Sequence, residues 1–220
     1  MERMKPAGKL DFDERPYIVI WETTQACDLA CVHCRACAQP RRSPLELSTD
    51  EAKGLIVQIA ELQVPVFVLT GGDPLKRPDI FELVEYAGGK GVHTSMTPSA
   101  TPLLTRATLA ELKRCGLARL AVSLDGSSAA LHDAFRRVPG SYRWTLDAIR
   151  WARELGLPVQ INTTITRHNL EDFDATARLL EGLDIVLWSV FFLVPTGRGT
   201  SAHSGAEPMR RTAPVCGRGL

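Results

Sequence analysis

Residues 66–74 read VFVLTGGDP, a β-branched and aromatic run followed at once by two glycines, an aspartate and a proline. The run predicts a buried strand, and the residues after it predict a turn at its end. Before it, Ser48-Thr49-Asp50-Glu51 has the form of a capping box, and apolar residues follow at helical spacing to residue 62. Residues 78–89 after the turn predict another helix, which two glycines end. The stretch is therefore a strand between two helices.

The same alternation continues along the rest of the chain. Further strands are expected at residues 17–21, 92–97, 119–124, 159–165 and 185–194, with helices at residues 105–115, 129–135, 141–155 and 169–180. The strands are apolar on both faces, as expected when helices cover both sides of a parallel sheet. The fold class is therefore α/β. Periodicity leaves two forms open, an open doubly wound sheet and a partial barrel.

Composition excludes several classes of function. The 26 Lys and Arg nearly balance the 25 Asp and Glu, which gives a net charge of +1 and no argument for binding nucleic acid or an anionic membrane. The longest apolar stretch, Ile185–Val194, is too short to span a bilayer. Residues 1–16 have no apolar core like that of a signal peptide. We therefore expect a cytoplasmic protein.

Four of the six cysteines lie within eleven residues, after the first predicted strand. Such a cluster, in a chain without an export signal, indicates a metal site rather than a disulfide framework. Cys27, Cys31 and Cys34 form a C-x3-C-x2-C pattern. Three thiolates can hold three irons of a [4Fe–4S] cluster and leave the fourth iron open to another ligand.

The cysteine cluster has two other interpretations. A ferredoxin run that included Cys37 would need another cysteine where the sequence has Arg41. A structural zinc site usually pairs two separate C-x2-C knuckles, and the sequence has no second knuckle. Spacing and ligand softness favour iron–sulfur over zinc, which stays the alternative. Cys37 is then expected to be a bystander.

The cysteine pattern after the first strand and Gly71-Gly72-Asp73-Pro74 after the second resemble the radical S-adenosylmethionine (SAM) superfamily. Ser123-Leu124-Asp125-Gly126 and Asn162 resemble its signatures on strands four and five. The segments at 136–141 (RRVPGS) and 194–199 (VPTGRG) resemble its SPASM-associated branch, which modifies haem or peptides. The resemblance covers residues 15 to 199 and implies a partial (β/α)6 TIM-like barrel of parallel strands.

The resemblance also implies roles for individual residues. Three cysteines would bind the [4Fe–4S] cluster, and the glycine loop would hold the amino group of SAM with its backbone, a role unaffected by aspartate in place of the family's usual glutamate. Polar residues at the carboxyl ends of parallel strands are placed to bind a ligand. The expected SAM-binding residues are Gly71, Gly72, Asp73, Pro74, Ser123, Asp125, Arg136, Asn162 and His33, of which Arg136 would bind the carboxylate and His33 would stack near the adenine.

The implied activity is reductive cleavage of SAM to a 5′-deoxyadenosyl radical, which abstracts hydrogen from an unknown small-molecule or peptide substrate. The implied partners are SAM and an electron donor such as a flavodoxin or ferredoxin. The alternative is a truncated, non-catalytic iron–sulfur or zinc-binding α/β domain.

The sequence predicts three segments: an N-terminal extension at 1–15, the core domain at 16–199 and an irregular or disordered tail at 200–220. Members of the SPASM-associated branch continue into a cysteine-rich domain. Only Cys216 follows the sixth strand here, so no auxiliary cluster is expected from these residues alone.

Overall fold

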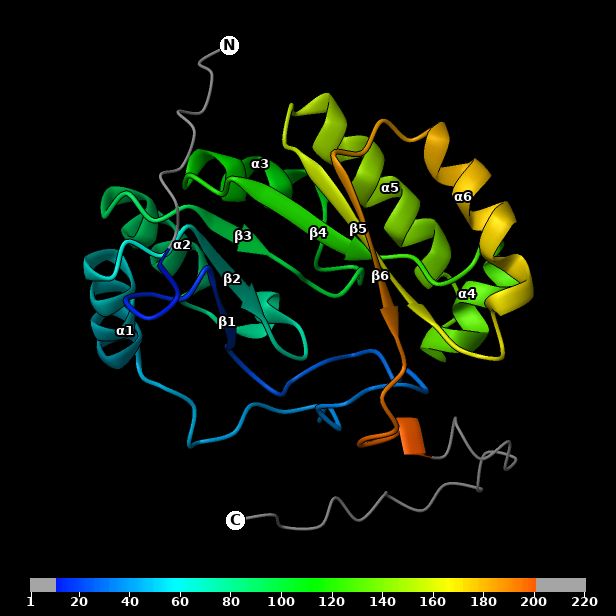
Figure 1. Cartoon of the computed structure of the whole chain (residues 1–220), viewed down its shortest axis with the longest axis horizontal. Helices are drawn as coiled ribbons and strands as arrows, with labels where there is room; N and C mark the ends of the chain where they lie inside the picture. Colours follow the sequence, from blue (N-terminus) through cyan, green and yellow to red (C-terminus); the bar gives the residue numbers. More distant parts are fainter. Residues whose placement is uncertain (1–10, 201–220) are drawn as a thin grey trace.

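In the computed structural model, which describes residues 11–200, the chain forms a six-stranded parallel sheet with strand order β1-β2-β3-β4-β5-β6. The strands are β1 (Ile18–Glu22), β2 (Val66–Thr70), β3 (Thr94–Met96), β4 (Arg119–Ser123), β5 (Val159–Ile165) and β6 (Leu187–Phe192). Each strand pairs with the next one along the chain, so the strand order never reverses. The sheet curls in one direction from β1 to β6. This arrangement is the predicted partial barrel and not the doubly wound sheet (Figure 1).

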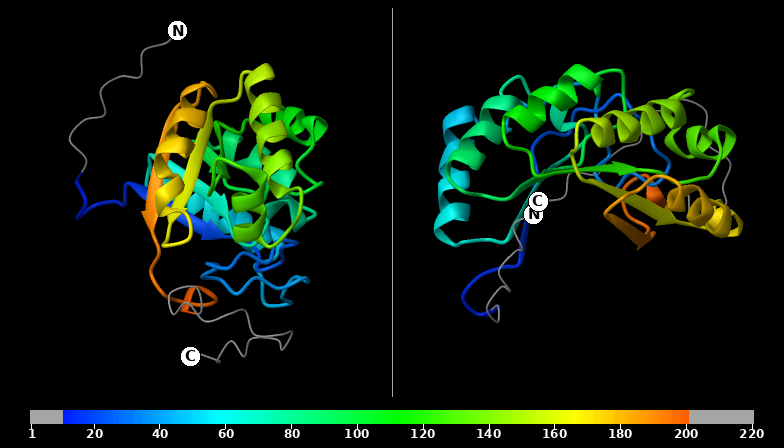
Figure 2. Two further views of the ribbon diagram at one scale, coloured as in Figure 1. Left: turned by 90° about the vertical axis from the view of Figure 1, so that its right-hand side faces the viewer. Right: turned by 90° about the horizontal axis from the view of Figure 1, so that it is seen from above.

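The helices between the strands are α1 (Thr49–Glu61), α2 (Ile80–Gly89), α3 (Arg106–Arg114), α4 (Ala129–Arg136), α5 (Ser141–Glu154) and α6 (Phe173–Glu181), with two 3-10 helices, η1 (Pro74–Lys76) and η2 (Leu170–Asp172). They line the convex side of the sheet and leave its concave side open (Figure 2). The expectation of helices on both faces is therefore wrong. Val66 and Val68, two of the inward side chains of β2, are apolar although they are only partly buried, which made the strand look like one buried on both sides.

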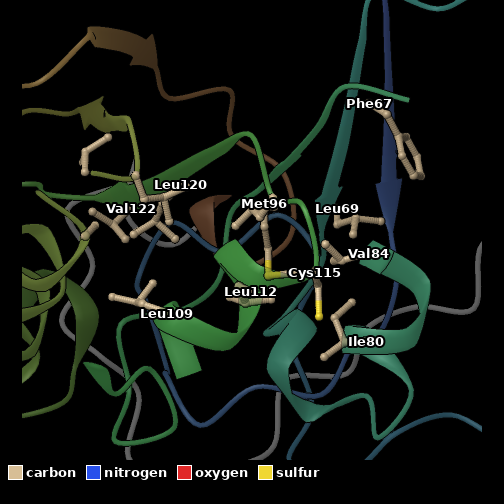
Figure 3. Close-up of a cluster of buried hydrophobic side chains, with 14 of the residues drawn as sticks. Phe67, Leu69, Ile80, Val84, Met96, Leu109, Leu112, Cys115, Leu120 and Val122 are labelled. Atoms are coloured by element: carbon tan, nitrogen blue, oxygen red, sulfur yellow. The ribbon is translucent and has the colours of Figure 1, made fainter. Parts of the chain in front are cut away.

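The hydrophobic core fills the space between the convex face of the sheet and the helices. Phe67 and Leu69 of β2 and Leu120 of β4 are fully buried there against α2 and α3 (Figure 3). Cys115, at the end of the helix predicted over residues 105–115, is 4% exposed within the same core. One face of each strand is thus committed to the core, and the other faces the barrel interior.

Local sequence signals place some element ends correctly and others not. Ser48 accepts from the backbone N–H of Glu51, and the Glu51 carboxylate accepts from that of Ser48, which is the predicted capping box. Asn169, at the start of the helix predicted over residues 169–180, does not cap it with its side chain. Its amide donates to the carbonyls of Asp125 and Thr164 instead, which ties the ends of β4 and β5 together. None of the helices in the described part is long and apolar enough to be a transmembrane segment.

Candidate active site

The loop from residue 23 to 48, which carries the clustered cysteines, lies at the carboxyl ends of the strands (Figure 1). Its start is fixed by backbone hydrogen bonds to the end of β2, because Thr23 N–H donates to the carbonyl of Thr70 at 2.8 Å. Ala26 then forms a parallel bridge with Gln39, which closes the cysteine-bearing segment into a compact turn. Residues 23–48 therefore form an ordered loop across the edge where α/β proteins bind ligands.

Cys27, Cys31 and Cys34 gather in one small apolar cluster within this loop. Cys27 and Cys31 are buried, Cys34 is half-buried, and Leu29, Ala38 and Val138 surround them. In the part of the chain that the structure describes, no three His, Cys, Asp or Glu side chains converge closely enough to hold a single metal ion. The three thiols thus belong to one largely apolar cluster, but they do not converge on a single ion position.

Polar groups from three directions reach these sulfurs. The backbone N–H of Leu29 donates to Cys27 Sγ at 3.3 Å, and the Ser99 hydroxyl lies 3.1 Å from the same atom. The Arg136 guanidinium donates to Cys31 Sγ at 3.5 Å. Hydrogen bonds of this kind stabilise thiolates, although burial raises the pKa of the Cys27 thiol. Burial therefore outweighs the hydrogen bonds at Cys27 and favours its thiol form, while the donors offset part of the cost of a thiolate there.

The glycine loop packs backbone against backbone on the segment that leads into Cys27. The N–H of Gly72 donates to the carbonyl of Thr24, and that of Asp73 donates to the carbonyl of Ala26, each at 2.7 Å. A Cβ atom at Gly71 would lie 2.3 Å from the Thr24 carbonyl oxygen, and one at Gly72 would lie 2.4 Å from that of Ala26. Gly71 also has a φ of +139°, which side chains rarely adopt. Only glycines permit this approach at both positions.

Asp73 and Pro74 continue this loop, with side chains turned into the protein. Asp73 is completely buried and accepts from the backbone N–H of Leu75 at 3.2 Å and the hydroxyl of Thr101 at 3.3 Å. Burial raises the pKa of Asp73 to about 6. Pro74 is buried at the first position of η1. Both residues fix the shape of the turn, and neither lines the adjacent cavity.

A cavity of about 160 Å³ lies between the glycine loop, the end of β4 and the start of α5. Four of the predicted residues line it: Gly71, Gly72, Ser123 and Arg136. Leu29 from the cysteine loop and Ser99 from the segment after β3 complete the side nearest the thiols. The structure therefore brings part of the predicted set around one space next to Cys27.

Arg136 and Asp125 form a buried ion pair beside this cavity. The backbone N–H of Thr164 donates to the second carboxylate oxygen of Asp125 at 2.8 Å. Burial disfavours the charge on Arg136, but Asp125 and Cys31 raise its pKa, so the guanidinium stays charged. Because Arg136 contacts both Asp125 and Cys31 Sγ, it links the end of β4 to the cysteine loop.

His33 stacks on Phe135, with ring centroids 4.6 Å apart. Burial, and the charges of Arg136 and Arg198, lower the pKa of His33 to about 3. Its ring is therefore neutral, and its buried Nδ1 atom has no hydrogen-bond partner among residues 11–200. The ring belongs to the cysteine loop itself and is not among the residues that line the cavity.

Asn162 lies on the concave face of β5, in register with Ser123 of β4. Its side-chain oxygen accepts from Gln160 Nε2 at 2.9 Å. Asn162 therefore belongs to a polar group within the barrel interior and does not line the cavity beside the thiols.

The segment after β6 closes over the cysteine loop from the far side of the barrel. The backbone N–H of Arg198 donates to the carbonyl of Cys34 and its side chain donates to that of Cys31, both at 3.0 Å. A Cβ atom at Gly197 would lie 2.6 Å from the Cys34 carbonyl oxygen. The segment at 194–199, which follows the last strand, thus binds the cysteine loop, which follows the first strand.

Sequence reasoning assigned no role to Ser99, His132 or Arg198. The Asp125 N–H donates to His132 Nδ1 at 3.1 Å, and burial, with Arg136, lowers the pKa of His132 to about 3. His132 is thereby fixed in its neutral form with Nε2–H as donor, and the ring lines the cavity. The only sequence signal for His132 is its spacing of seven residues from Asp125, which follows a predicted strand. That spacing alone is too weak to indicate a site residue.

The donor set fits a [4Fe–4S] cluster with one open iron. Three soft cysteine sulfurs lie in one apolar cluster, and amide, hydroxyl and guanidinium groups reach the sulfurs of Cys27 and Cys31. A cavity lined by backbone and by a charged arginine lies next to them, which suits a small zwitterion. The residues present are thus suited to both groups that the sequence implies.

Residues 21–180 match the family model of the Radical SAM superfamily. An AdoMet-dependent heme synthase from Oleidesulfovibrio alaskensis is 43% identical over 190 residues, which are 86% of this chain and 48% of that protein. An Fe-coproporphyrin III synthase from Methanosarcina barkeri is 36% identical over 197 residues, 89% of this chain and 49% of that protein. The chain spans about half the length of these curated relatives.

The fold matches the structure of Streptococcus suis SuiB bound to its precursor peptide SuiA, with a TM-score of 0.72 and 18% identity, over 83% of this chain and 40% of SuiB. That likeness supports the partial barrel. The family match covers well over half of the chain and includes the cysteine loop, the glycine loop and the strand ends described above. The chain therefore belongs to the radical SAM superfamily, whose members use a [4Fe–4S] cluster and S-adenosylmethionine.

Proposed function

We propose that Cys27, Cys31 and Cys34 hold three irons of a [4Fe–4S] cluster and that SAM binds in the adjoining cavity. The observation that carries this proposal is the direct backbone contact between the cysteine segment and the glycine loop. A Cβ atom at Gly71 or Gly72 would clash with backbone oxygens of the cysteine segment. When bound, the cluster supplies the electron that cleaves SAM to a 5′-deoxyadenosyl radical. Gly71 and Gly72 bring the SAM site next to the thiols and so shorten the path of that electron.

The other residues around the cavity orient SAM. Arg136 is charged and buried, and a guanidinium is the group best suited to bind a carboxylate in two places. Ser123, at the end of β4, offers a hydroxyl to the ribose. Asp125 positions the Arg136 guanidinium through their ion pair, and His132 accepts from the Asp125 N–H after the end of β4. Both residues therefore support the site by contacts within the protein. The Arg198 segment holds the cysteine loop in place.

We further propose that the substrate is a tetrapyrrole. The support is the relatives named heme synthase, at 43% to 45% identity, and the Fe-coproporphyrin III synthase. The helices leave the concave face of the sheet uncovered (Figure 2), and apolar side chains on that face, such as Ile20 and Phe191, are exposed and could contact such a flat molecule. An electron donor of the flavodoxin or ferredoxin type, in the cytoplasm, would reduce the cluster.

Anaerobic reconstitution with iron and sulfide, followed by dithionite and SAM, tests the activity. The expected product is 5′-deoxyadenosine, with about four irons bound per chain. Cys31→Ala should abolish product and lower the iron content, whereas Cys115→Ala, which removes a thiol from the remote core, should leave both unchanged. Zinc in place of iron, or an intact cluster that never cleaves SAM, would contradict the proposal.

A further inference from the structure

The concave face of the sheet carries a row of side chains at one level of the barrel. The parallel register aligns Ile20 of β1, Val68 of β2, Ser95 of β3 and Arg119 of β4. The next residue along β4, Leu120, is fully buried in the core beneath the helices. Since successive side chains of a strand point to opposite faces, Arg119 points into the barrel interior.

Among residues 11–200, Arg119 has no carboxylate partner. Within this range its guanidinium donates only to Gln160 Oε1, at 3.4 Å, and it is half-buried. Among the inward positions of the six described strands, the one carboxylate is Glu22, and Glu22 pairs with Arg35. A cation withdrawn from water without a counter-charge costs free energy, so an anionic group from outside the chain would be favoured here.

Gln160 and Ser189 extend this position into a polar group that can accept a ligand. Gln160 Nε2 donates to Ser189 Oγ at 3.2 Å and to Asn162 Oδ1 at 2.9 Å. These bonds hold the Gln160 amide so that its oxygen faces Arg119. The Ser189 hydroxyl keeps its own proton to donate to a bound oxygen.

Apolar side chains border this polar group at both edges of the sheet. Ile20 on β1 is 60% exposed, and Phe191 on β6 is 51% exposed, although both belong to regular strands. Phe191 is in register with Thr164, which places it on the concave face with Gln160 and Asn162. A ligand with a flat apolar body and a carboxylate arm matches this combination of apolar edges and a single inward cation.

We propose that Arg119, with Gln160 and Ser189, binds a carboxylate of the substrate inside the barrel. The proposal rests on the proposed function, because it places the substrate on the concave side of the SAM site. The guanidinium fork takes the carboxylate in two hydrogen bonds, and Ile20 and Phe191 contact the apolar body. Arg119 is thus a specificity-determining residue, remote from the cluster, that anchors the substrate by one arm.

Binding of coproporphyrin III, a tetrapyrrole with four propionate arms, to the reconstituted chain tests this assignment. Its absorbance and its quenching of tryptophan fluorescence give the Kd without turnover. Arg119→Gln should weaken binding about tenfold or more, since a hydrogen bond to a charged group is lost. Arg119→Lys should restore part of the affinity, because it keeps the charge and loses the fork.

Arg143→Gln is the matched control, because the Arg143 side chain is 87% exposed on α5. It should leave the Kd unchanged, and all three variants should retain wild-type iron content and SAM affinity. Equal coproporphyrin binding by the wild type and Arg119→Gln would overturn the subsite. Failure of the proposed function appears separately, as a wild-type chain that binds coproporphyrin through Arg119 but does not cleave SAM.

Discussion

The carboxyl edge of the barrel and its concave face are built in different ways. At the edge, the glycine loop, the cysteine loop and the segment after β6 contact one another through backbone atoms at hydrogen-bond distance. On the concave face the strands present side chains such as Arg119, Gln160 and the exposed Ile20. These side chains make few packing contacts, so other residue types could occupy the same positions. The edge therefore tolerates little change, while the concave face can change by single substitutions without disturbing the fold.

This difference separates the part of the chemistry shared by the family from the part specific to a substrate. Holding a cluster and SAM next to each other needs fixed positions, which backbone contacts provide. Selecting a substrate needs variable side chains on a stable scaffold. Substitutions at the edge should therefore impair the cluster and SAM together, whereas substitutions on the concave face should alter substrate binding alone.

Gly72→Ala should have the largest effect on SAM affinity and on stability. Its Cβ would meet the carbonyl oxygens of Ala26 at 2.4 Å and Gln25 at 2.7 Å, and neither backbone can move without displacing the cysteine loop. We expect SAM affinity to fall at least about tenfold and stability by roughly 1–3 kcal/mol. Equilibrium binding of SAM and urea denaturation measure the two effects.

Gly54→Ala is the matched control, because a Cβ at Gly54 meets no atom within 4 Å. In the interior of α1 it should raise stability by about 0.5–1 kcal/mol and leave SAM affinity unchanged. If Gly72→Ala bound SAM as the wild type does, the close backbone contact would have no role in the site.

Asp73→Asn should change the pH dependence of the free energy of unfolding, an effect of intermediate size. The folded chain holds the pKa of Asp73 at about 6, above its ordinary value of 3.8, because the carboxyl is buried. The folded state thus binds the proton more tightly than the unfolded state. The resulting stability is present below pH 4 and is lost as the pH rises through about 6.

Urea denaturation of the metal-free chain between pH 4 and pH 7 measures this loss. The wild type should lose on the order of 2 kcal/mol more than Asp73→Asn over this range, since each unit of pKa shift corresponds to about 1.4 kcal/mol. Parallel stability curves for the two proteins would show that Asp73 titrates normally in the folded chain.

Ile20→Ser should have the smallest effect on the fold. The side chain is 60% exposed on the concave face, so the stability change should stay within about 0.5 kcal/mol. Iron content and SAM affinity should be unchanged, while coproporphyrin III should bind a few-fold more weakly because apolar contact is lost. Leu170→Ser, at an exposed position outside the barrel interior, is the control for both assays. Loss of SAM binding in Ile20→Ser would mean that the two regions are not independent.

The sequence predicted the order of elements well, because each strand and helix has its own local signal. VFVLT at 66–70 and the capping box at Ser48 appear where expected. The direction of curling and the open concave face were not predictable, since Val68 is as apolar as its buried neighbours Phe67 and Leu69. Which face a strand commits to the core depends on the helices, and no local pattern records it.

For the site, the sequence identified the residue types and left their partners unknown. Arg136 and Arg137 are neighbours of the same residue type, and only the fold shows that Arg136 is buried against Asp125 while Arg137 ends α4 in a left-handed conformation. The contact between Arg198 and Cys31 spans 167 residues, and Ser99 reaches Cys27 across 72. Contacts at such separations follow from closure of the barrel, which local sequence does not encode.

The electron paramagnetic resonance spectrum of the reduced, reconstituted chain, recorded with and without SAM, tests most directly whether three cysteines leave one iron open beside the glycine loop. We predict the signal of a [4Fe–4S] cluster that changes when SAM is added to the wild type. In Gly72→Ala we predict the same change only at much higher SAM concentration. A wild-type spectrum identical with and without saturating SAM would contradict an open iron next to the SAM site.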